Sequence, residues 1–161
     1  LVISTVDIAE AKEYVITNCA PRDNLKDNYI TEIEVGKAVR ASSSFPAFFC
    51  PCEFKNHIFM DGGVLDNTPV LPLKQICDKK IIAVNFESDS VGEDCDVMDV
   101  IMKSLDIMGN KISEKSFEQS DLILTIPTDG AGLFDIDKLD KCYQFGYNTV
   151  MRNLKKFRDL L

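Results

Sequence analysis

Residues 57–70 read HIFMDGGVLDNTPV, an apolar strand-like segment that runs into an aspartate and two glycines. Asp-Gly is a common turn signal, so Asp61 has an ordinary structural interpretation. A hairpin at Asp61-Gly62 would need a returning strand, however, and the following residues lead into a helix near Pro69 instead. We therefore expect Asp61 at the carboxyl end of a strand that feeds a crossover, where open α/β sheets bind their ligands.

Strand-like and helix-like patterns alternate along the rest of the chain. Strands are predicted at LVIST (1–5), EYVIT (13–17), KIIAVNF (80–86) and LILTIP (122–127). Helices are predicted at EIEVGKAVRASSS (32–44), at VLPLKQIC (70–77), at VMDVIMKSLDIMGNKI (97–112) and from Leu139 to Phe157. From residue 57 onward, strand and helix alternate three times, which implies a parallel sheet with right-handed crossovers. The predicted fold class is α/β, with a mostly parallel sheet and helices on both faces.

The last predicted helix has the clearest pattern. Its apolar residues recur every three or four positions from Cys142 to Phe157. Lysine and arginine residues lie near its carboxyl end, where they suit the helix dipole. We expect this apolar stripe to pack against the core rather than to form a groove for a partner.

Charge and hydropathy exclude several classes of protein. The net charge of −8 argues against a nucleic-acid partner, which needs a clustered basic surface. Part of the acidity lies in ESDSVGEDCD (87–96), which we expect to be a solvated loop before a helix cap. No apolar run approaches the roughly 20 residues of a membrane span, and no signal peptide is visible. We expect one domain without a transmembrane segment, in the cytoplasm or peripherally at a membrane.

Six cysteines are spread through the predicted core segments: Cys19, Cys50, Cys52, Cys77, Cys95 and Cys142. The Cys50-Pro-Cys52 spacing differs from that of zinc ribbons, and a single histidine leaves few further ligands. We therefore expect reduced, buried thiols in a reducing compartment. Neither a metal site nor a cofactor is predicted.

The single histidine, His57, tests whether Asp61 belongs to a Ser-His-Asp triad. Four strand residues separate the two side chains by roughly 13 Å at about 3.3 Å each. A working hydrogen bond between them needs about 3 Å. His57 is therefore not expected to be a partner of Asp61, and more simply is a partly exposed strand residue.

Several segments, taken in order, resemble a known family. They are LVISTVDIAEAKEYVIT (1–17), AVRASSSFPAFFCP (38–51), MDGGVLDNTPV (60–70), IIAVNF (81–86) and FDIDKLDKCYQFGYNTV (134–150). Together they resemble the second half of the patatin-like phospholipase domain, in its bacterial type. The resemblance implies that residues 1–161 are the C-terminal portion of a larger patatin-like α/β domain.

The family resemblance implies a lipid acyl hydrolase with a Ser-Asp dyad and no cofactor. The Asp61-Gly62-Gly63 triplet stands at the position of the family's catalytic aspartate, so Asp61 is implied to be the general base. The serine nucleophile should lie in a Gly-x-Ser-x-Gly turn, and this chain has none. Residues 42–44, in ASSSF, lack flanking glycines. We therefore expect the nucleophile in an N-terminal half that is not in this chain, which alone should be inactive.

Two other functions stay open. The chain can be a non-catalytic module that uses exposed apolar surface to dimerise or to bind the other half of the domain. The alternation of strands and helices also suits half of a nucleotide-binding fold. That fold needs a glycine-rich phosphate loop after a strand, and the sequence contains none. The expected partners are therefore a lipid or ester substrate and the missing half-domain or a second copy.

Overall fold

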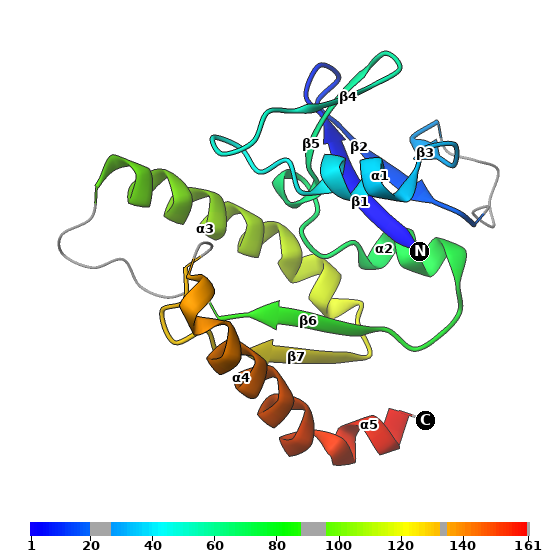
Figure 1. Ribbon diagram of the computed structural model, residues 1–161. Helices are drawn as coiled ribbons and strands as arrows, with labels where there is room; N and C mark the ends of the chain where they lie inside the picture. The colour runs from blue at the N-terminus through cyan, green and yellow to red at the C-terminus, as the bar shows by residue number, and fades with distance from the viewer. Residues whose placement is uncertain (20–26, 88–95, 133–134, 161) are drawn as a thin grey trace. The chain divides into compact units, whose positions relative to one another are not determined.

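The computed structural model describes residues 1–19, 27–87, 96–132 and 135–160 (Figure 1). The chain forms two compact units, one of residues 1–79 with 107–119 and one of residues 80–106 with 120–161. Cys95, most of the acidic run 87–96 and Phe134 lie outside the described residues. Each unit is considered by itself below.

The first unit is built on a five-stranded sheet with the strand order β3-β2-β1-β5-β4. The strands are β1 (Val2–Asp7), β2 (Lys12–Thr17), β3 (Tyr29–Ile30), β4 (Cys52–Phe54) and β5 (His57–Asp61). The helices are α1 (Val35–Ser42), the 3-10 turn η1 (Gly62–Val64), α2 (Val70–Ile76) and the second half of α3 (Val97–Glu118). The predicted strands at residues 1–5 and 13–17 and the helices after residues 32 and 69 are confirmed.

The sheet of the first unit is mixed, so the predicted mostly parallel sheet is not confirmed. Strand β1 pairs antiparallel with both β2 and β5, β4 pairs antiparallel with β5, and only β2 and β3 are parallel. The physical reason is two tight hairpins, since strands joined by a short turn must run antiparallel. Ala11 closes the first hairpin with φ of 51° and Lys55 closes the second with φ of 53°. The α/β class itself is confirmed.

The core of the first unit lies under helix α1, which packs against β1, β4 and β5. Ala38 and Ala41 of α1 are buried, and Ala41 belongs to the same core cluster as the fully buried Phe59 of β5. Small residues let the helix approach the sheet closely. The helix begins three residues later than predicted, because Glu34 has an extended backbone, and it ends at Ser42.

The second unit contains the parallel pair of strands that the sequence predicts. Its elements are β6 (Ile82–Phe86), β7 (Leu122–Ile126), the 3-10 turn η2 (Ile136–Lys138), α4 (Leu139–Arg152), α5 (Leu154–Leu160) and the first half of α3. Ile82 lies opposite Leu122 in a parallel register. The single long helix predicted from Leu139 is wrong at its end. Asn153 interrupts it, because its amide Nδ2 donates to the carbonyl of Thr149 at 2.8 Å.

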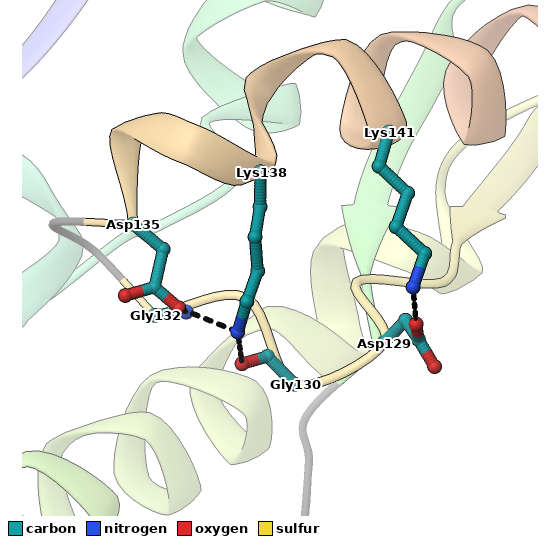
Figure 2. A network of polar contacts seen from close by, with 6 residues as sticks. All are labelled: Asp129, Gly130, Gly132, Asp135, Lys138 and Lys141. Atoms are coloured by element: carbon teal, nitrogen blue, oxygen red, sulfur yellow. Dashed lines mark hydrogen bonds and ion pairs between the residues drawn. The ribbon is translucent and has the colours of Figure 1, made fainter.

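A network of polar contacts fixes the start of α4 (Figure 2). Lys138 donates to Asp135 at 2.7 Å and to the carbonyl of Gly130 at 3.0 Å, and Lys141 pairs with Asp129. Asp129 and Gly130 both have positive φ, so the chain turns sharply at this point. Exposed pairs of this kind contribute little to stability. They link the turn after β7 to η2 and to the first turn of α4.

The apolar stripe of α4 is not core, contrary to the prediction. No residue of α4 is fully buried, and Tyr143 is 68% exposed. The helix packs against β7, where an added Cβ on Gly146 would lie 3.9 Å from Ile126. Neighbouring strand β6 buries Ala83 but leaves its larger apolar residues exposed: Ile82, Val84 and Phe86. A two-stranded sheet is too narrow to cover the whole stripe, so apolar surface remains.

The five cysteines in the described residues are free thiols. The prediction that they are buried is right for Cys52 and wrong for Cys19 and Cys50, which are exposed. Both exposed thiols lie outside the strands and helices, Cys19 just after β2 and Cys50 just before β4. Within the described ranges, no helix is long and apolar enough to cross a membrane.

Candidate functional site

The end of strand β5 is held from both sides. Asp61 lies opposite Thr5 of β1, whose hydroxyl donates to the carbonyl of Met60 at 2.7 Å. On the other side, the Asp61 N–H donates to the carbonyl of Ser44 at 3.1 Å, just after helix α1. Asp61 is therefore the last residue of a strand that leads into a helical turn, as predicted. These bonds fix its backbone independently of its side chain.

The Asp61 side chain caps the turn that follows. Its Oδ1 accepts the Gly63 N–H at 2.8 Å, at the first turn of η1. A Cβ on Gly62 would lie 2.5 Å from the carbonyl oxygen of Ser4, a distance that real side chains do not reach. A Cβ on Gly63 would lie 3.1 Å from Asp61 Oδ1 itself. Gly62 is thus required by the close approach of the Ser4 backbone, and a side chain at Gly63 would crowd the carboxylate; neither glycine has a positive φ.

A cavity of about 240 Å³ opens beside the carboxylate. Its walls come from the start of β1, the end of α1 and the turn before α2: Val2, Ile3, Ser4, Ser42, Asp61, Gly62, Gly63, Asp66, Asn67 and Pro69. Ligand pockets of drug-sized molecules usually measure about 300–1,000 Å³. This cavity can hold the reacting end of a substrate but not a whole lipid.

The position of Asp61 makes its carboxylate a stronger base than a free aspartate. The side chain is half-buried, and this burial raises the pKa of the Asp61 carboxyl above its ordinary value, although the Gly63 N–H partly opposes the shift. Within the described ranges, no lysine, arginine or histidine forms an ion pair with it. A carboxylate without a cationic partner keeps its affinity for a proton.

A second carboxylate, which sequence reasoning missed, lines the same cavity. Asp66 Oδ1 accepts the Thr68 N–H at 3.2 Å and the Ser116 hydroxyl at 3.5 Å. Burial raises the pKa of the Asp66 carboxyl too. In the sequence, Asp-Asn-Thr-Pro reads as a turn before a helix, and the Thr68 bond agrees with that interpretation. Only the fold shows that the turn faces Asp61.

The hydrogen-bond partner of His57 is Asp7, not Asp61. Its Nδ1 lies 2.7 Å from Oδ2 of Asp7, at the far end of the paired strands β1 and β5. The side chain of His57 is 23% exposed, which agrees with the predicted partly exposed strand residue. Burial alone would raise the pKa of the Asp7 carboxyl, but hydrogen bonds from His57, Glu10 and Ala9 hold it below its ordinary value. No local sequence pattern indicates this pair, because 50 residues separate its members.

The three serines of ASSSF lie at the end of α1. Ser43 donates to the carbonyl of Val39 at 2.8 Å, and the buried Ser44 donates to the carbonyl of Arg40 at 2.7 Å. Arg40 in turn donates to the Ser44 hydroxyl. Ser42 lies on the wall of the cavity beside Asp61. None of them sits on the sharp strand-to-helix turn that exposes a serine nucleophile.

Comparison with known families gives a match for this part of the chain. Residues 5–74 match the family model described as patatin-like phospholipase. The match includes both hairpins, helix α1, the Asp61 turn and most of α2, and it ends before the second unit. It thereby confirms the resemblance predicted from the sequence, and the segment that positions Asp61 is patatin-like.

Proposed function

We propose that this chain is part of a lipid acyl hydrolase that uses a Ser-Asp dyad, and that Asp61 is its general base. The family match supports membership of a lipid-hydrolysing class. The observation that carries the proposal is the half-buried Asp61 carboxylate at the strand end, with a raised pKa and an open cavity beside it. The substrate is a lipid or other carboxylic ester, reached from the cytoplasm or at a membrane surface.

The geometry of Asp61 suits a direct proton transfer. Its Oδ1 is held by the Gly63 N–H, so Oδ2 is the oxygen left to accept a proton from a serine hydroxyl. As that proton moves to Asp61, the serine oxygen attacks the ester carbonyl. Asp61 then gives the proton to the departing alcohol, and an acyl-enzyme remains. Water hydrolyses the acyl-enzyme in a second cycle, in which Asp61 again takes and returns one proton.

The nucleophile in this proposal lies outside the present sequence. The chain has no Gly-x-Ser-x-Gly turn, and the hydroxyls of Ser43 and Ser44 are committed to carbonyls of α1. The limited volume of the cavity agrees with a site that needs a further wall. We therefore propose that residues 1–161 form the C-terminal portion of the domain and that this portion alone is inactive.

One observation favours a second function, that of an interaction module. Strand β6 exposes Ile82, Val84 and Phe86, and helix α4 exposes the stripe that the sequence pattern marks for burial. Exposed apolar surface of this extent is typical of an interface. Under the main proposal, the same surface binds the other half of the domain.

Ester hydrolysis separates the two functions. The intact protein, with its upstream segment, should hydrolyse p-nitrophenyl butyrate, whereas the isolated chain should not exceed a blank. Light scattering after size exclusion should show the isolated chain as a dimer or larger species under both functions. An intact protein that binds its partner but never hydrolyses an ester would leave only the interaction module.

A further inference from the structure

Three side chains of metal-binding type meet at the end of β5 that lies away from Asp61. Asp7 is the last residue of β1, Glu10 lies in the turn to β2, and His57 is the first residue of β5. One ligand atom from each lies within 4.8 Å of the others. The function proposed above does not use them. In the described part of the chain they join two segments that are 50 residues apart.

The two carboxylates of this cluster are oriented by further hydrogen bonds. Asp7 Oδ1 accepts the N–H groups of Ala9 at 2.8 Å and Glu10 at 3.2 Å, which turns Oδ2 toward the cluster. The Asp7 side chain is only 1% exposed. Glu10 is oriented by Tyr14, whose hydroxyl donates to Glu10 Oε2 at 2.7 Å. Partners of this kind are what fix the ligands of a metal site.

The imidazole of His57 is fixed by contacts with two aromatic rings. Its ring stacks on Phe59, with centroids 5.2 Å apart and planes inclined by 15°. Tyr14 also packs against it, with ring centroids 4.6 Å apart and planes inclined by 55°. With the ring fixed in this way, Nδ1 points at Asp7 Oδ2, 2.7 Å away. The imidazole thus supplies the one nitrogen among ligand atoms that all lie within 4.8 Å of one another.

We propose that Asp7, Glu10 and His57 form a binding site for a divalent transition-metal ion, with Zn²⁺ as the first candidate. One imidazole nitrogen, two carboxylate oxygens and a water molecule make a four-coordinate set that Zn²⁺ accepts at about 2.0–2.2 Å. Ca²⁺ and Mg²⁺ prefer oxygen ligands alone, so the imidazole selects against them. No metal site was expected from the sequence because the chain has a single histidine. The fold places two carboxylates, Asp7 and Glu10, beside that histidine.

Metal binding would replace the hydrogen bond between His57 and Asp7. Without metal, a proton bridges His57 Nδ1 and Asp7 Oδ2. An ion bound to Nδ1 takes its place, and that proton moves to Nε2 as the ring changes tautomer or, from a charged imidazole, leaves to solvent. Because the site joins the end of β1 and the β1–β2 turn to the start of β5, an ion would tie β1 to the strand that ends at Asp61. The distance of about 13 Å along β5 makes its role structural.

The single histidine makes a direct test simple. Co²⁺ added to the full chain should move the ring-proton resonances of His57 far outside their normal range, with one ion bound per chain. Binding to cysteine thiols would not affect the imidazole in this way. Zn²⁺ should abolish the shifted signals by competition and should raise Tm. Normal His57 signals at saturating Co²⁺ would overturn the proposal.

A matched pair of variants tests whether the Glu10 carboxylate contributes to metal affinity. Glu10 and Glu53 are both exposed glutamates of the first unit, but only Glu10 belongs to the cluster. Glu10→Gln should weaken Co²⁺ binding at least about tenfold, while Glu53→Gln should leave it unchanged. Both variants should fold, because neither side chain is buried. Equal affinities in Glu10→Gln, Glu53→Gln and the unaltered chain would overturn the assignment.

Discussion

Replacement of Asp61 by asparagine isolates proton transfer from the other roles of this residue. Asparagine keeps the shape of the side chain and the carbonyl oxygen that accepts the Gly63 N–H. It replaces the basic oxygen Oδ2 with an amide that cannot take a proton. The backbone of Asp61 stays fixed by Ser44 and by pairing with Thr5, so the turn should form unchanged.

The expected loss of activity is large and the expected loss of stability is nil. Removal of a positioned general base costs about 10²- to 10⁴-fold, so kcat of the intact enzyme on p-nitrophenyl butyrate should fall at least about 100-fold. That factor corresponds to about 2.7 kcal/mol in the activation free energy. Burial raises the pKa of Asp61, which means that the folded state disfavours the charge. Tm at neutral pH should therefore stay equal or rise.

Asp66→Asn is the matched control, since it makes the same chemical change in the same cavity. Asp66 already accepts hydrogen bonds from Thr68 and Ser116, which an asparagine oxygen can also accept. We expect a loss in kcat at least tenfold smaller than that of Asp61→Asn. Nearly full activity in Asp61→Asn, or unfolding of that variant, would refute the reasoning and make Asp61 a turn residue.

Three further predictions concern pH, the turn and the histidine. Asp61 must be ionised to act and burial raises its pKa, so the acid limb of kcat/KM should lie above the ordinary value of 3.8. As pH rises from 3.8 through that raised pKa, the unaltered protein should lose stability relative to Asp61→Asn in chemical denaturation, because its folded carboxyl still holds a proton that the unfolded one has lost. Gly62→Ala should lower the free energy of unfolding by about 1–3 kcal/mol, because the new Cβ meets the Ser4 backbone at 2.5 Å. Gly36→Ala, in open space within α1, should raise it by about 0.5–1 kcal/mol; equal Tm values in the two variants would contradict this account. His57→Ala should leave kcat within a few-fold, because about 13 Å separates it from Asp61, and a loss as large as that of Asp61→Asn would show that the imidazole takes part.

The Asp61 turn could be predicted because the sequence signals that mark it are local. Strand, aspartate, glycines and helix follow one another within residues 57–76, so their order alone places Asp61 at a strand end. The glycines carry a local signal as well, although the reason for Gly62 is the approach of Ser4 from another strand. Asp66 shows the limit of such reasoning. The sequence indicates the turn at Asp66. The position of Asp66 in the cavity depends on how that turn packs against β1 and α1.

The remainder depended on contacts between distant residues. Strand β4 has three residues, and the Lys55-Asn56 turn lacks the usual Asn-Gly signal, so the hairpin and its antiparallel pairing were missed. The Asp7–His57 pair forms only because β1 and β5 lie side by side (Figure 1). The stripe on α4 shows the same limit. Periodicity identifies the face of a helix that favours burial, but not whether anything covers it.

Labelling with a fluorophosphonate probe tests the central claim most directly, because the probe reacts only with an activated serine. In the intact protein, the account predicts a single labelled serine outside residues 1–161, and a labelling rate that falls at least about 100-fold in Asp61→Asn. The isolated chain should remain unlabelled. Label on Ser42, Ser43 or Ser44, or an equal labelling rate in Asp61→Asn, would contradict the assignment of Asp61 as the base of a serine that lies elsewhere.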